Sequence, residues 1–208
     1  MVTHPDKIFV VGNSSIDMLK HTLEKEYNQE LIAGLEDKRI ILLTTHRREN
    51  LGENMQNIFE AVNEICKRYE DIVFIFPIHK NPKIRELASN ILDNDKQIRI
   101  IEPLDVIDFH HIINKSELIL TDSGGIQEEA PHLGRPVLVL RDATERPEGV
   151  RAGCLKLVGT NKEDILNNVI NLLDNKEEYN KMSNASNPYG DGTTSKQIVQ
   201  ILIEGINE

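Results

Sequence analysis

The chain has 208 residues, of which 39% are hydrophobic and 28% charged, with a formal net charge of −10 and two cysteines. This length suits one substantial α/β domain, and the acidic balance argues against a nucleic-acid surface, because phosphate backbones attract basic patches. Cys66 and Cys154 fit no metal-binding spacing, so we expect both to pack in the interior. The sequence shows no signal peptide and no apolar run of the ~20 residues that a membrane helix needs, which predicts a cytoplasmic protein without membrane contact.

Short apolar runs alternate with longer amphipathic stretches along the chain. The apolar runs predict strands at residues 8–11, 39–44, 72–77, 97–101, 118–121, 137–140 and 155–158. The amphipathic stretches predict helices at 15–27, 54–69, 83–92, 106–114, 126–133, 162–175 and, after a turn-rich segment, 196–206. Several strands are continuous apolar runs, as expected where helices cover both faces of a parallel sheet. The predicted fold class is therefore α/β, with a doubly wound, Rossmann-like parallel sheet.

Five polar segments directly follow predicted strands. They are THRREN (45–50), PIHKNP (77–82), IEPLD (101–105), TDSGG (121–125) and RDATERPEG (141–149). In a doubly wound fold, ligands bind beyond the carboxyl ends of the strands. We therefore expect these segments to gather along one edge of the sheet and to form a ligand site there.

The most informative of these segments joins a strand to a helix through a glycine turn. Ser123, Gly124 and Gly125 would expose backbone N–H groups at a helix N-terminus, which suits a phosphate, and the glycines would let the backbone approach the ligand closely. Glu129, chosen over Glu128, is then placed to accept hydrogen bonds from sugar hydroxyls. Together these features predict a nucleotide diphosphate site. The simpler interpretation is a tight turn whose glycines serve backbone geometry alone.

Other charged residues at the same edge are open to two interpretations. His46 and Arg47 could neutralise phosphate oxygens, with His46 also giving a proton to a departing phosphate, or they could belong to a solvated loop. For His79, the residues alone favour a structural, hydrogen-bonded histidine. The loop 141–149 is either solvated or closes over a sugar diphosphate, with Arg146 on a phosphate.

Five segments carry a resemblance that covers essentially the whole chain. They are VGNSSIDML (11–19), TTHRREN (44–50), PIHKNP (77–82), TDSGGIQEEAPHLGRPVLVLRDATERPEG (121–149) and NPYGDG (187–192). In order and approximate spacing the chain resembles the non-hydrolysing UDP-N-acetylglucosamine 2-epimerases, which have the glycosyltransferase-B architecture. The resemblance implies interconversion of UDP-GlcNAc and UDP-ManNAc by elimination and re-addition of UDP, without a metal or other cofactor.

The resemblance also implies roles by position. Ser123, Gly124 and Gly125 would hold the UDP diphosphate, and Glu129 would bind the ribose hydroxyls. His46 would contact the nucleotide phosphates and help UDP to depart. Two further residues match positions that, in some bacterial members, contact a second UDP-GlcNAc acting as an allosteric activator; they are Arg47 and His79.

The family's architecture has two Rossmann-like domains with the active site between them, and this chain corresponds to the second. We predict a UDP-binding domain at 1–195 and a terminal helix at 196–208 that would pack on the missing first domain. Because the family's acid–base residues at C2 lie in that first domain, the chain alone is expected to bind UDP or a UDP-N-acetylhexosamine weakly and not to epimerise it.

The remaining partners and functions stay open at this point. In the absence of a first domain, the apolar stripe of the last helix would pack on its own domain or on another copy, giving a homodimer; it comprises Ile198, Val199, Ile201, Leu202 and Ile206. A separately encoded N-terminal domain is the other expected partner. The alternative functions are the nucleotide-binding domain of a UDP-sugar glycosyltransferase and a non-catalytic UDP-sugar-binding module.

Overall fold

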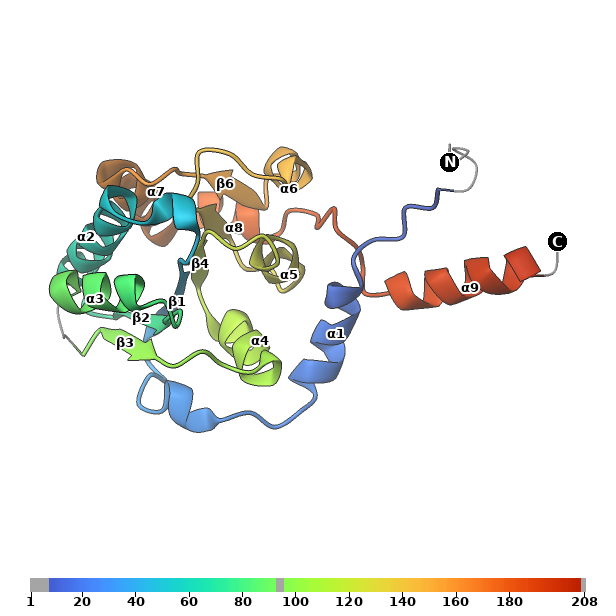
Figure 1. Cartoon of the computed structure of the whole chain (residues 1–208), viewed down its shortest axis with the longest axis horizontal. Coiled ribbons are helices and arrows are strands. Elements are labelled where there is room, and N and C mark those ends of the chain that lie inside the picture. The colour runs from blue at the N-terminus through green and yellow to red at the C-terminus, as the bar shows by residue number, and fades with distance from the viewer. Residues whose placement is uncertain (1–7, 93–95, 207–208) are drawn as a thin grey trace.

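The computed structural model describes residues 8–92 and 96–206, and its centre is a parallel six-stranded sheet (Figure 1). The strands are β1 (Arg39–Thr44), β2 (Ile72–Pro77), β3 (Ile98–Ile101), β4 (Leu118–Thr121), β5 (Val137–Val139) and β6 (Leu155–Leu157). Their order across the sheet is β3-β2-β1-β4-β5-β6, so the chain winds outwards from β1 in one direction and from β4 in the other. This is the Rossmann strand order, and it confirms the predicted fold class.

Helices cover both faces of this sheet. They are α1 (Ser14–Leu23), α2 (Glu53–Arg68), α3 (Pro82–Ile91), α4 (Val106–Lys115), α5 (Ile126–His132), α6 (Pro147–Ala152), α7 (Lys162–Asp174), α8 (Lys176–Ser183) and α9 (Thr194–Ile206), with short 3-10 turns at Gln29–Ile32 and Arg48–Asn50. Polar side chains start most of them by accepting hydrogen bonds from N–H groups of the first turn, as Asn81 does before α3 and Asp105 before α4. Local sequence therefore fixes where these helices begin.

The strands are apolar along their whole length because both faces are buried. On β1, Ile41 and Leu43 pack in the core layer shared with α2, α3 and α7. The alternate residues Ile40 and Leu42 pack in the opposite layer, with α4 and α5. The two cysteines, Cys66 and Cys154, are buried in these layers, which confirms their expected packing role.

Three sequence-based assignments need correction. The predicted strand at 8–11 is wrong: residues 8–13 form no strand, Val10 is 95% exposed, and the segment is tied to the later turn by the hydrogen bond from Asn13 N to Tyr189 O. Its apolar character indicated burial, but nothing in the sheet pairs with it. Helix α6 begins at Pro147, within the segment 141–149 that was treated as a loop, and α8 follows α7 after a single residue, Asn175, which caps it.

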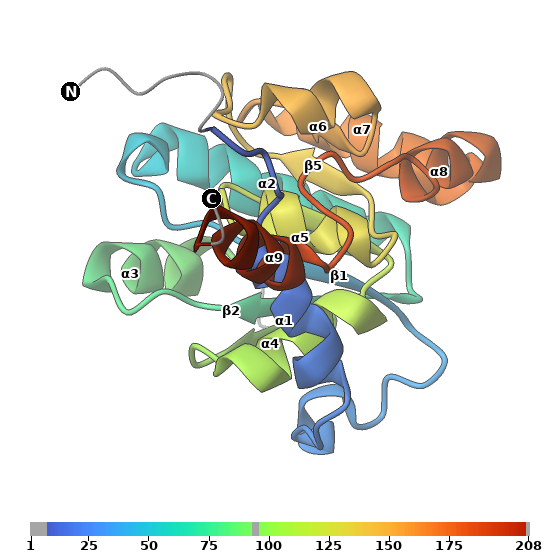
Figure 2. The ribbon, with the colours of Figure 1, turned by 90° about the vertical axis from the view of Figure 1, so that its right-hand side faces the viewer.

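Helix α9 projects away from the domain body and contacts α1 (Figures 1 and 2). Its apolar stripe is not packed on its own domain as one alternative predicted, because Val199 and Leu202 are 55% and 59% exposed and only Ile201 is half-buried. The first seven residues of the predicted UDP-binding domain, the last two of the predicted terminal helix and the side chain of Ile206 lie outside the described residues.

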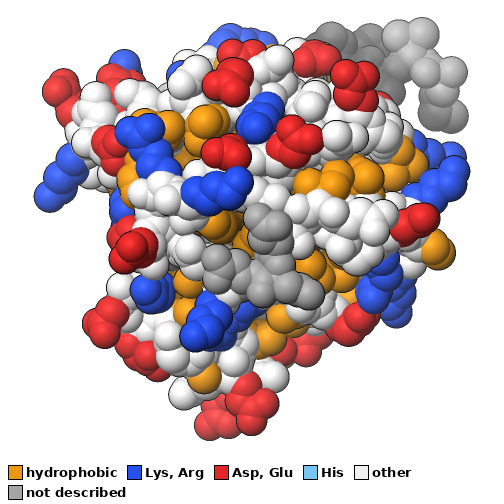
Figure 3. All heavy atoms as spheres, turned by 90° about the vertical axis from the view of Figure 1, so that its left-hand side faces the viewer, with side chains coloured by type: hydrophobic (Ala, Val, Ile, Leu, Met, Phe, Trp, Pro, Cys, Tyr) orange, Lys and Arg blue, Asp and Glu red, His pale blue; other side chains and the backbone are white. Residues whose placement is uncertain are grey.

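The surface has a mixed charge pattern on the face opposite α9. Acidic and basic side chains alternate there with small apolar areas (Figure 3). Within the described residues, no helix combines the length and apolar character needed to cross a bilayer.

Candidate functional site

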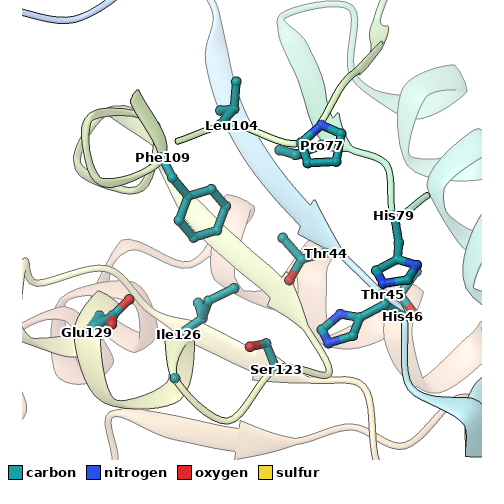
Figure 4. Close-up of a pocket in the computed structure, with 12 residues that line it drawn as sticks. Thr44, Thr45, His46, Pro77, His79, Leu104, Phe109, Ser123, Ile126 and Glu129 are labelled. Atoms are coloured by element: carbon teal, nitrogen blue, oxygen red, sulfur yellow. The ribbon is translucent and has the colours of Figure 1, made fainter. Parts of the chain in front are cut away.

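A pocket of about 410 Å³ lies beyond the carboxyl ends of four neighbouring strands, where the winding direction of the sheet reverses between β1 and β4 (Figure 4). Its walls come from four of the predicted polar segments, and its lining comprises Thr44, Thr45, His46, Pro77, His79, Pro103, Leu104, Phe109, Ser123, Gly125, Ile126 and Glu129. Ligands of open α/β sheets bind at this place in the fold. The predicted convergence at one sheet edge is confirmed for these four segments.

The glycine turn forms one wall of the pocket. Gly125 is the N-cap of α5 with φ −63° and ψ −43°, a conformation open to any residue, so backbone geometry alone does not call for glycine there. A Cβ on Gly125 would come within 4.0 Å of Glu129 Oε1, and no closer contact is found. Within the described chain no side chain caps α5, which leaves N–H groups of its first turn for other acceptors. The turn thus presents bare backbone to the cavity.

A buried carboxylate fastens the facing loop to this turn. Asp122 has no exposed side-chain surface. Its Oδ2 accepts hydrogen bonds from four groups at 2.9–3.0 Å; they are Thr45 Oγ1, the backbone N–H groups of His46 and Arg47, and Asn50 Nδ2. Its Oδ1 lies 3.3 Å from Nδ1 of His46. One side chain therefore sets the position of the whole segment that carries His46.

The two histidines of the pocket lie against each other. The rings of His46 and His79 are stacked, with centroids 5.6 Å apart and planes inclined by 12° (Figure 4). Nδ1 of His79 accepts a hydrogen bond from the backbone N–H of Asn81 at 3.0 Å. The structure thus brings His79 beside His46 and Ser123, which the residues alone did not favour.

Of the two adjacent glutamates, Glu129 faces the pocket. Its Oε2 lies 3.7 Å from Nε2 of His110, whose Nδ1 is 2.7 Å from Oγ1 of Thr22. His110 and His111 are both buried, and the ring of His111 stacks on Tyr27. Because His110 is buried, Glu129 has a fixed neighbour in this histidine.

Glu128 points to the other side of the turn and binds Arg146. Arg146 Nε donates to Glu128 Oε1 at 2.5 Å, and Asn13 Nδ2 donates to the second oxygen. The Arg146 guanidinium lies behind Gly124, where a Cβ would meet Nη2 at 3.4 Å. Gly124 and Arg146 are therefore next to the turn without being part of the pocket lining.

The loop 141–149 packs behind the site. Arg141 donates two hydrogen bonds to Glu145 and so lowers the pKa of that carboxyl to about 2. The Tyr189 hydroxyl donates to Arg146 O and accepts from Gly149 N–H, and burial raises its pKa to about 12. The NPYGDG segment thereby braces the loop.

The structure assembles most of the predicted site residues and adds others. His46, His79, Ser123, Gly125 and Glu129 share the pocket, whereas Arg47 uses its Nε to donate to Asp122 O. Phe109, whose ring points into the cavity, was not anticipated (Figure 4). Phe109 belongs to an amphipathic helix, where an aromatic residue is usually interpreted as part of the hydrophobic core. Its place at the pocket follows only from the position of α4. Asp122 was in the motif, but its contacts join residues more than 70 positions apart.

This is a Rossmann-like domain with a ligand pocket of mixed polar and apolar walls at the switch point of its sheet. The family model that matches the chain, over residues 1–203, is that of UDP-N-acetylglucosamine 2-epimerase. The UDP-N-acetylglucosamine 2-epimerase of Bacillus subtilis is 52% identical over 198 residues, which are 95% of this chain and 52% of the relative.

Two solved structures agree with this match. The Staphylococcus aureus protein MnaA, solved with UDP, superposes with a TM-score of 0.94 at 50% identity, over 98% of this chain and 56% of that one. The UDP-GlcNAc 2-epimerase of Neisseria meningitidis, bound to UDP-GlcNAc, gives a TM-score of 0.90 at 42% identity, over 97% and 57%. The chain belongs to the UDP-N-acetylglucosamine 2-epimerase family. It spans about half the length of the curated relatives it matches.

Proposed function

We propose that this chain is the nucleotide-binding half of a UDP-GlcNAc 2-epimerase and that it holds the UDP part of the substrate in the pocket at the β1–β4 switch point. The observation that carries the proposal is the meeting of His46, Ser123, Gly125 and Glu129 in one cavity, in a chain of this family. Relatives of this chain were solved with UDP and with UDP-GlcNAc.

The walls of the pocket suit the three parts of UDP in order. The bare backbone at Ser123 and Gly125, with His46 opposite, offers hydrogen-bond donors to the diphosphate. Glu129 offers carboxylate oxygens to the ribose hydroxyls. The apolar end formed by Phe109 gives an aromatic face on which a pyrimidine ring can stack. Arg146, behind Gly124, would add positive charge close to the diphosphate.

The proposed reaction separates UDP from the sugar. A base takes the C2 proton, the C1–O bond breaks with its electron pair staying on the β-phosphate oxygen, and a C1=C2 double bond forms. Protonated His46 would donate to that oxygen and so stabilise departing UDP. UDP then adds back after a proton is delivered to the other face of C2, which inverts that centre.

The base for C2 is proposed to come from a second domain. Among the described residues that line the pocket, Glu129 is the one carboxylate, and it is assigned to the ribose. The exposed apolar face of α9 beside α1, which includes Val199 and Leu202, would pack on that domain. Residues 1–195 would then be the UDP-binding domain, and the chain alone would not epimerise.

Other parts of the prediction remain proposals. Arg47 and His79 would contact a second UDP-GlcNAc that acts as an activator. Homodimerisation and a cytoplasmic location stay predictions, the first testable by light scattering.

The proposal is tested in two steps. Isothermal titration calorimetry of the purified chain with UDP should give saturable binding, whereas no saturation up to millimolar UDP would reject the ligand. UDP-ManNAc formation is then measured for the chain alone and with the N-terminal half of the Bacillus subtilis relative. Activity only in the mixture is expected; full turnover by the chain alone would contradict the need for a second domain. Binding without activity in any mixture would favour a non-catalytic module, and sugar transfer to an acceptor would indicate a glycosyltransferase.

A further inference from the structure

We infer that Asp122 is a positioning residue that fixes the protonation of His46, holding the proton on Nδ1 and presenting Nε2 to the ligand. The inference deepens the proposed function, because it concerns the histidine assigned to the departing phosphate. It rests on the contacts of one buried carboxylate and does not depend on which ligand binds.

The two carboxylate oxygens of Asp122 have different surroundings. Oδ2 accepts from four N–H or O–H donors, which occupy it fully. Oδ1 faces His46, at 3.3 Å from ring atom Nδ1 and 3.2 Å from the backbone N–H. An ionised carboxylate can only accept hydrogen bonds. A ring nitrogen beside it is therefore favoured as an N–H donor, so Nδ1 of His46 is favoured as the protonated nitrogen.

His79, which stacks on His46, has the opposite hydrogen bonding at Nδ1. Nδ1 of His79 accepts from the backbone N–H of Asn81, so the proton of neutral His79 belongs on Nε2. The two rings thus hold opposite tautomers within one stack. His46 presents an unprotonated Nε2, able to take up and donate a proton, and His79 presents an N–H donor.

The carboxylate of Asp122 also affects what His46 can do chemically. An aspartate beside a catalytic histidine holds the imidazole in one tautomer and stabilises the imidazolium when it forms. At His46, the imidazolium is the form that would donate from Nε2 to the phosphate oxygen. Asp122 is buried next to the ring of His46 and does not line the pocket, so its action is exerted through His46.

The structure determines how the amide of Asp122→Asn is oriented and therefore which tautomer of His46 it favours. The amide oxygen must take the Oδ2 position, because four donors point at it. The amide NH₂ then faces Nδ1 of His46 as a donor. Nδ1 must accept, and the proton moves to Nε2. If the substitution only loosened the loop and placed no NH₂ donor at Nδ1, His46 would show a mixture of the two tautomers.

The experiment is two-dimensional ¹⁵N NMR of the histidine ring nitrogens in the full chain, at a pH well above the usual histidine titration range. His46 and His79 are assigned among the seven histidines by His46→Ala and His79→Ala. In the wild-type chain we expect Nδ1–H for His46 and Nε2–H for His79. In Asp122→Asn we expect Nε2–H at both positions.

Two controls keep the outcome interpretable. Asn50→Ala removes one donor from Oδ2 but leaves the carboxylate, so the His46 tautomer should stay Nδ1–H. His79 serves as an internal control, because the backbone of Asn81 fixes its tautomer. An Nε2–H tautomer of His46 in the wild-type chain, or Nδ1–H retained in a folded Asp122→Asn chain, overturns the inference. The wild-type measurement decides the matter even if Asp122→Asn does not fold, and failure of UDP to bind would count against the proposed function while leaving this result untouched.

Discussion

The substitution Gly125→Ala separates the stability of the glycine turn from its function as a ligand cradle. The backbone at this position is helical, with φ −63°, and an added Cβ meets no atom closer than 4.0 Å. Alanine is therefore accommodated without strain. Two small effects oppose each other, since alanine is a poorer N-cap than glycine but restricts the unfolded chain, so the free energy of unfolding should change by less than about 1 kcal/mol.

The same methyl group would project into the space that the phosphate needs. Losing one charge-assisted hydrogen bond from the turn costs about 1.5–3 kcal/mol, which corresponds to roughly a 10- to 150-fold weaker UDP affinity. The assay is isothermal titration calorimetry with UDP, beside thermal unfolding of the same samples. Gly205→Ala is the matched control, because Gly205 lies in α9 with nothing within 4 Å of its added Cβ. Unchanged UDP affinity in Gly125→Ala would refute the assignment of the diphosphate to this turn.

Three further predictions concern the ribose contact, the brace behind the site and an ion pair at the far end of the sheet. Glu129→Ala should abolish any preference for UDP over 2′-deoxy-UDP in calorimetry, a preference worth about 1.5–3 kcal/mol if the carboxylate binds the 2′-hydroxyl; a preference that persists would remove Glu129 from that role. Tyr189→Phe deletes the acceptor of the Gly149 N–H, so urea unfolding should show a loss of about 1–3 kcal/mol, and no loss would mean that solvent replaces the hydroxyl. Arg39 lowers the pKa of Asp71 by hydrogen bonding, so this pair stabilises the fold above the unfolded carboxyl pKa and ceases to do so as pH falls through the folded value. Because both side chains are partly exposed, Asp71→Asn should cost no more than about 1 kcal/mol at pH 7, and this cost should shrink as the pH falls below the unfolded carboxyl pKa; a cost that does not change with acidification would contradict the linkage.

Much of the fold could be predicted because its strands are short apolar runs separated by clear helical patterns. The bounds of β1, β2 and β4 agree with the sequence prediction residue for residue. The segment 8–11 misled because apolar composition indicates burial but does not identify a pairing partner. Helix α6 could have been found, since Pro147 occupies its first turn and Gly153 ends it in the left-handed conformation at φ +85°.

The residues that share the site could be predicted from the topology of the sheet. The hydrogen-bond and ion-pair partners of their side chains could not. Side chains that follow parallel strands must share one sheet edge, which placed His46, Ser123 and Glu129 together. The partner of each charge is a matter of side-chain direction, and sequence spacing does not reveal it. The prediction of Arg146 at a phosphate did not include its hydrogen bond to Glu128, which lies eighteen positions away. Asp122 was not among the predicted site residues for the same reason.

The turn at residues 123–125 is proposed to hold the diphosphate of UDP, and amide NMR of the ¹⁵N-labelled chain tests this most directly. Titration with UDP, UMP and uridine should shift the amide signals of Ser123, Gly124 and Gly125 most strongly with UDP, less with UMP and least with uridine. The signals of His46 and Phe109 should move in the same titration. Saturable shifts confined to another part of the surface, such as the hollow beside Lys38 and Arg99, with the turn unmoved, would contradict the account.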